Sequence, residues 1–153
     1  MFKYCLWLVV NDPKVIEQNK KIAELLNTNP FIPHITINHT MPTPMFYSGI
    51  HRPNNIYFVD QPTASTSFVC DEDNNMRLFH AIEQKVYVPY FKDVEAHMSL
   101  AYRVDGEPFT LQDLMRIPIL GLDLINYKVQ KKNLKIKNAN CWDDNPEKWY
   151  IIT

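Results

Sequence analysis

Alternating apolar residues open the chain. Between positions 2 and 10 one face carries Phe2, Tyr4, Leu6, Leu8 and Val10, and the other carries Lys3, Cys5, Trp7 and Val9. A period of two indicates a β-strand, and a second face that is only partly polar is typical of a strand inside a sheet. We therefore predict a central strand over residues 2–10.

A helix is predicted directly after this strand. Asp12 followed by Pro13 combines an N-cap residue with the residue favoured in the first helical turn. Glu17 and Lys21 stand four apart, as a stabilising pair does, outside an apolar stripe of Val15, Ile22, Ala23 and Leu26. These signals predict a helix over residues 13–27, because the segment from Asn27 to Pro30 breaks the pattern.

The middle of the chain shows shorter patterns. Ile32–Asn38 alternates like a strand, and residues 40–54, rich in proline, predict a long loop that we treat as a candidate lid. Asn55–Asp60 and Thr66–Cys70 predict a strand pair around Gln61-Pro62. Residues 74–87 predict a second helix, since their apolar residues recur at spacings of three and four: Met76, Phe79, Ile82 and Val86.

The last third returns to strands. Glu95–Arg103 is strand-like, and Thr110–Ile117 predicts a short helix capped by Thr110. Further short strands are predicted over Leu122–Val129, Leu134–Lys137 and Trp149–Ile152. Strand, helix and strand thus recur twice, and no linker-like shift in composition divides the chain. We expect an α+β fold with two lobes in one domain, residues 1–153.

Composition and charge narrow the class of protein. The chain is 46% hydrophobic, but its longest apolar run, Cys5 to Val10, is far shorter than the roughly 20 residues of a membrane span. Neither that run nor its flanks fit a secretory signal. A net charge of −1 is too balanced for a general nucleic-acid binder, so recognition of phosphate should be local.

Cysteines and glycines exclude further classes. Cys5, Cys70 and Cys141 form an odd set without CxxC spacing, which argues against a disulfide framework and a thiolate zinc site. A reducing, cytoplasmic setting fits such a set. Three glycines without a P-loop or a GxGxxG turn give no support to the corresponding nucleotide-binding folds.

One basic cluster interrupts the balanced charge. It consists of Lys128, Lys131, Lys132, Lys135 and Lys137. The favoured interpretation is a solvated face of a hairpin, and the alternative is a patch that steers an anionic ligand toward the protein.

Two matched histidine motifs carry the functional hypothesis. His34-Ile35-Thr36-Ile37 and His97-Met98-Ser99-Leu100 both contain histidine, an apolar residue, a hydroxyl residue and an apolar residue. Alternate residues of a strand share a face, so each strand would present one imidazole and one hydroxyl together. A chance repeat of a short motif is the alternative explanation, and the matching apolar neighbours make it less favourable.

These four side chains suit attack at a phosphodiester. One imidazole can take a proton from the attacking oxygen while the other gives a proton to the departing oxygen, since a pKa of about 6.5 allows both forms near neutral pH. The hydroxyls can hold the phosphoryl oxygens. No metal or other cofactor is required for this chemistry, and His39 lies on the opposite face from His34 on a regular strand.

At these residues the chain resembles the 2H phosphoesterase superfamily (LigT-like proteins), named for two H-x-[ST]-x motifs on two pseudo-symmetric lobes. It is most similar to the cyclic phosphodiesterase branch. Tyr4-Cys5-Leu6-Trp7 resembles that branch's Tyr-Ser-Val-Trp, Pro33-His34-Ile35-Thr36 its Pro-His-[IL]-Thr, and the segment from His97 to Tyr102 its His-[LM]-Ser-Leu-x-Tyr. Ala96 stands where the branch usually has proline.

The resemblance implies a fold and a set of roles. The fold would be two lobes of antiparallel sheet with outer helices and a cleft between the lobes. His34 and His97 would be catalytic, with His97 as base and His34 as acid, and Thr36 and Ser99 would bind phosphate. Tyr102 and Trp7 would contact the nucleotide, although Tyr102 is out of phase with Ser99 unless a bulge intervenes.

The expected activity is metal-independent hydrolysis of a 2′,3′-cyclic phosphate on a nucleotide or an RNA end, by a hydrolase that acts as a monomer away from membranes. One alternative is a viral-type enzyme that degrades a cyclic dinucleotide or a 2′-5′ oligoadenylate. Another, outside enzymes, is a module that binds RNA ends without turnover and with strong dependence on salt.

Overall fold

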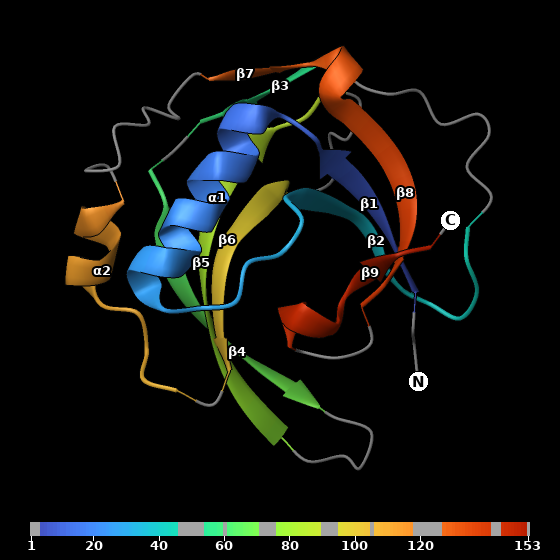
Figure 1. The fold of residues 1–153 in the computed structure, drawn as a ribbon. Coiled ribbons are helices and arrows are strands. Elements are labelled where there is room, and N and C mark those ends of the chain that lie inside the picture. The colour runs from blue at the N-terminus through green and yellow to red at the C-terminus, as the bar shows by residue number, and fades with distance from the viewer. Residues whose placement is uncertain are drawn as a thin grey trace.

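In the part of the chain that the structure describes, an antiparallel β-sheet is accompanied by two α-helices. The computed structural model describes residues 4–45, 54–59, 61–70, 76–89, 95–104, 106–117, 127–141 and 145–152. Hydrogen-bonded neighbours in the sheet follow the order β7-β3-β5-β6-β2-β1-β8-β9, and β4 pairs with β5 beside this path (Figure 1). The predicted α+β class is therefore confirmed. Much of the predicted loop at 40–54, namely residues 46–53, lies outside the described residues.

The first strand lies inside the sheet, as predicted. β1 (Tyr4–Val10) pairs with β2 (His34–Met41) on one side and with β8 (Leu134–Asn140) on the other. Its two faces enter two different clusters. Leu6, Leu8 and Val10 belong to the main core, and Cys5, Trp7 and Val9 form a smaller cluster on the other face.

The predicted N-terminal helix is α1 (Pro13–Leu26), and Figure 1 shows it lying across the β6 side of the sheet. The Asp12 carboxylate caps it by accepting a 2.9 Å hydrogen bond from the backbone N–H of Lys14. The hydroxyl of Tyr127 donates to the same carboxylate at 2.9–3.0 Å. The predicted apolar stripe is buried, and Glu17 and Lys21 form a 3.3 Å ion pair outside it.

The prediction of a helix over 74–87 is wrong. These residues form β5 (Met76–Tyr87), which pairs with β4 (Thr63–Cys70) and β6 (His97–Val104). The buried face of β5 includes His80, Ile82, Gln84 and Val86, a period of two. Because His80 and Gln84 are polar, the sequence does not show the alternation of buried and exposed positions on this strand. The remaining apolar residues recur at the spacing that is typical of a helix. His80 is 2% exposed on this strand.

The predicted pairing of the two strands around Gln61-Pro62 is also wrong. β3 (Asn55–Phe58) and β4 lie one after the other along the same edge of β5, with Phe58 opposite Val86 and Thr63 opposite Glu83. Gln61-Pro62 therefore interrupts one edge instead of reversing the chain.

The remaining elements follow the predictions more closely. α2 (Leu111–Arg116) begins at Thr110, whose hydroxyl and backbone exchange hydrogen bonds with Asp113 in a capping box. β7 (Lys128–Gln130), the 3-10 helix η2 (Lys131–Asn133) and β8 follow, and then η3 (Pro146–Lys148) and β9 (Tyr150–Ile151). Residues 122–126 of a predicted strand lie outside the described residues.

A disulfide joins Cys5 to Cys141, which contradicts the argument against a disulfide framework. β1 and β8 pair Cys5 with Ala139, so Cys141, two residues further on, lies near Cys5 with a Cα–Cα distance of 6.3 Å. Such a separation is within disulfide range, and only the register reveals it. Because of this disulfide, the cysteines no longer support a reducing compartment.

Among the described helices, none combines the length and the apolar character needed to cross a membrane.

Candidate functional site

The two histidine motifs lie on neighbouring antiparallel strands. β2 and β6 pair at Ile35 and Met98, so the register sets His34 opposite Ser99 and Thr36 opposite His97. Ile35 and Met98 point into the core, and the four polar side chains consequently share the other face. His34 and His97 are diagonal neighbours on this face, and such positions are roughly 7–8 Å apart.

His34 is held by backbone and by aromatic rings. Its Nδ1 donates a 2.7 Å hydrogen bond to the carbonyl oxygen of Ile32. A carbonyl only accepts, so the neutral ring carries its lone pair on Nε2. The imidazole stacks on Trp7 with 3.7 Å between ring centroids, and the rings of Phe31 and Trp149 meet it edge-on. As a result His34 is 5% exposed.

Burial disfavours the protonated form of the His34 imidazole. Desolvation lowers its pKa from 6.5 to about 4, the bond to Ile32 opposes this, and the charge of His97 lowers the pKa further. The two imidazoles are thus within electrostatic reach of each other.

His97 repeats the backbone contact of His34 in a different environment. Its Nδ1 faces the carbonyl oxygen of Glu95 at 3.4 Å, again the residue two places earlier. Its Nε2 lies 3.9 Å from a carboxylate oxygen of Glu83, and the side chain is 48% exposed. An imidazolium at His97 would therefore have both water and a negative charge beside it.

Ser99 contacts the tyrosine that the motif predicted. Its Oγ lies 2.5 Å from the hydroxyl of Tyr102. The register of β5 and β6 shifts between the pairs Ile82–Ala101 and Glu83–Ser99, so Leu100 is an extra residue on β6. This irregularity is the bulge that Tyr102 needs to reach the motif face. Burial raises the pKa of Tyr102 to about 12, with the Ser99 bond lowering it and the charge of Glu83 raising it, so the phenol stays protonated.

The structure also brings Trp7 and Thr36 to this face. β1 pairs Trp7 with Thr36 and Val9 with His34, which puts the indole beside both motif residues of β2. Tyr4, whose parity on β1 is opposite to that of Trp7, packs against the main core instead. All six residues predicted for the site therefore gather around one face of β1, β2 and β6.

Sequence reasoning missed three further members of the site. Glu83 was assigned to a helix, and its position opposite Ser99 depends on β5 being a strand. Phe31 precedes a motif without belonging to it, and Trp149 comes from the C-terminal segment. Their rings contact each other and Tyr102 at centroid distances of 5.4–5.7 Å. Single aromatic residues far apart in the sequence form no pattern, so the sequence does not predict that they enclose His34.

Within the described ranges, no group of three or more His, Cys, Asp or Glu residues is arranged to hold a metal ion. A scan against protein-family models and a search of curated proteins found no match to this chain. The hypothesis for the site thus depends on its own geometry and on the motifs.

Proposed function

We propose that the protein is a metal-independent phosphodiesterase that opens the 2′,3′-cyclic phosphate of a nucleotide or an RNA end. The observation that carries this proposal is the juxtaposition of two imidazoles and two hydroxyls on one sheet face by the pairing of Ile35 with Met98. Each imidazole also has its Nδ1 directed at the carbonyl two residues earlier, so both rings offer Nε2 to a substrate.

The charges around the rings favour one assignment of base and acid. His34, with a pKa of about 4, is neutral at pH 7 and accepts the proton of the attacking water. His97, beside Glu83, donates a proton to the departing oxygen. The water oxygen bonds to phosphorus as a ribose oxygen leaves it, so a 2′,3′-cyclic phosphate becomes a phosphomonoester. This assignment is the reverse of the one that the family resemblance suggests.

The hydroxyls hold the phosphoryl oxygens. A protonated Tyr102 can donate to Ser99 Oγ, which leaves the serine hydroxyl hydrogen directed at a phosphoryl oxygen. Thr36 supplies the matching donor from β2. Donors placed in advance where negative charge grows are worth about 10²–10³ in rate each. Trp7 is 1% exposed and stacks on His34, so it would hold the imidazole in place.

The sheet order supports a division into two lobes. One lobe would consist of β1, β2, β8 and β9, and the other of β3, β4, β5, β6 and β7. The two motif strands, β2 and β6, would then lie next to each other at the junction. One histidine motif then comes from each lobe, as in the 2H arrangement. The C-terminal segment with Trp149 covers the His34 side of this junction.

A panel of substrates tests the proposal. The purified chain is incubated with 2′,3′-cyclic mononucleotides, an RNA ending in a cyclic phosphate, a cyclic dinucleotide and a 2′-5′ oligoadenylate, each with and without a chelator. We expect a phosphomonoester from the first two and no effect of the chelator. Turnover of only the last two would support the alternative of a signal-degrading enzyme. Ligand recovered intact from every incubation would overturn the proposal.

A further inference from the structure

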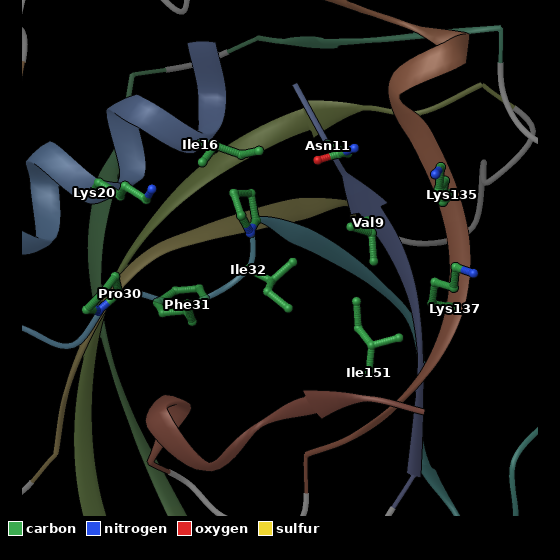
Figure 2. A pocket seen from close by; sticks show the side chains of 11 residues that line it. Val9, Asn11, Ile16, Lys20, Pro30, Phe31, Ile32, Lys135, Lys137 and Ile151 are labelled. Carbon is green, nitrogen blue, oxygen red and sulfur yellow. The ribbon is translucent and has the colours of Figure 1, made fainter. Parts of the chain in front are cut away.

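A cavity of about 550 Å³ lies beside the candidate site (Figure 2). Its apolar lining comes mainly from Val9 on β1, Ile16 on α1, Ile151 on β9 and the segment from Pro30 to Pro33. This volume is within the range of pockets that hold small organic molecules.

Lysines stand on two sides of this cavity. In Figure 2, Lys20 reaches in from α1, and Lys135 and Lys137 lie across from it on β8. β8 pairs Lys135 with Val9 and Lys137 with Trp7, while Ile136 between them is buried in the core. Strand alternation therefore places both lysines on the sheet face that carries the histidines.

The charge of the cavity is one-sided. No Asp or Glu is among its lining residues in the described chain, and none of its three lysines forms an ion pair there. An anion inside gains the field of three cations without displacing a protein carboxylate. Inorganic phosphate would leave the apolar lining unused, and a neutral molecule would leave the lysines unused.

The cavity is separate from the candidate site but shares a wall with it. Phe31 and Ile32 line the cavity, and the same two residues contact His34 through a ring and a carbonyl. Lys135 lies two strands from His34, with Val9 between them, a distance of roughly 10 Å at ordinary strand spacing.

We propose that this cavity binds a small amphiphilic organic anion, with an apolar body on Val9, Ile32 and Ile151 and an anionic group at Lys135 and Lys137. The lining satisfies both halves of such a ligand. A flat aromatic anion and an aliphatic carboxylate share this chemistry. The proposal does not depend on hydrolysis at the histidines.

Titration with 1-anilinonaphthalene-8-sulfonate, followed by its fluorescence, tests this site on the full chain. We expect one bound probe per chain and at least tenfold weaker binding in Lys135→Gln/Lys137→Gln. The matched control is Lys131→Gln/Lys132→Gln, which removes the same charge from exposed residues of η2 outside the cavity and should bind like the parent. Thermal unfolding of each variant shows that it is folded.

Displacement of the probe by AMP or by laurate identifies the body of the ligand. Displacement by either one supports the proposal and distinguishes an aromatic anion from an aliphatic one. If inorganic phosphate displaces the probe as well as they do, or if neither displaces it, the proposal is overturned. If Ser99→Ala loses probe binding while Lys135→Gln/Lys137→Gln binds the probe like the parent, the anion binds at the histidines. This result would also overturn the proposal.

Discussion

The buried imidazole of His34 predicts a specific dependence of stability on pH. In the unfolded chain His34 titrates near its ordinary pKa of 6.5, and in the folded protein its pKa is about 4. Between these values the unfolded chain binds more protons than the folded one, so the free energy of unfolding rises with pH. The contribution of His34 to the free energy of unfolding is therefore essentially complete above pH 6.5 and is lost as the pH falls toward 4.

The size of this effect follows from the two pKa values. Proton uptake by the unfolded chain between pH 7.5 and 5.0 corresponds to a loss of roughly 2 kcal/mol from the free energy of unfolding. Most carboxylates remain ionised over this interval, which keeps their contribution small. At pH 4 the loss from His34 alone reaches about 3 kcal/mol.

Urea unfolding at pH 7.5, 6.5, 5.5 and 5.0 measures the loss. The matched variant is His34→Asn, whose side-chain amide can still donate to the Ile32 carbonyl but does not titrate. The other four histidines are present in both proteins. We expect the stability curves of the two proteins to diverge by about 2 kcal/mol between the extremes. Parallel curves would refute a neutral, desolvated His34.

Two further substitutions test other contacts. Glu83→Gln should lower kcat on 2′,3′-cyclic AMP by about tenfold, with little change in KM, because His97 loses the carboxylate beside Nε2; Glu95→Gln, on an exposed side chain, is the control. Equal rates for both would rule out the role of Glu83. Asp12→Ala should cost about 2–3 kcal/mol of stability in urea unfolding, because α1 loses its cap and the Tyr127 hydroxyl its acceptor. A cost below about 0.5 kcal/mol would contradict that account.

Local signals in the sequence predicted the parts of the fold that local physics determines. Asp12-Pro13 begins α1, and Thr110 with Asp113 begins α2, because capping involves only neighbouring residues. The strong alternation at the N-terminus likewise predicted β1. In β1 every buried position carries an apolar residue, whereas α1 also buries Gln18 and Asn19.

β5 shows where this reasoning fails. Its core positions include His80 and Gln84, and Met76 at its start is 62% exposed. Hydrophobicity therefore does not report burial on this strand, which tertiary pairing on both sides holds in place. The misassignment also concealed Glu83, since a residue on a helix gave no reason to place it beside Ser99.

The motifs predicted the main residues of the candidate site, but they did not predict the aromatic residues that enclose His34. Strand alternation paired each histidine with its hydroxyl residue, and only the register of β2 and β6 brings the two pairs together. The stacking of Trp7 on His34 and the rings of Phe31 and Trp149 depend on long-range packing. That enclosure is what lowers the pKa of His34, and our proposed assignment of base and acid depends on it.

Cooperation between the two imidazoles on one phosphorus atom is the central claim, and a double-variant cycle tests it most directly. The rate of 2′,3′-cyclic AMP hydrolysis is measured for His34→Asn, His97→Asn and the variant with both changes, each checked for folding. We expect each single change to lower kcat by about 10²–10⁴ and the double change to be only a few-fold worse than either, because the residues act as a unit. Near-parental rates in either single variant, or losses that simply multiply, would contradict it.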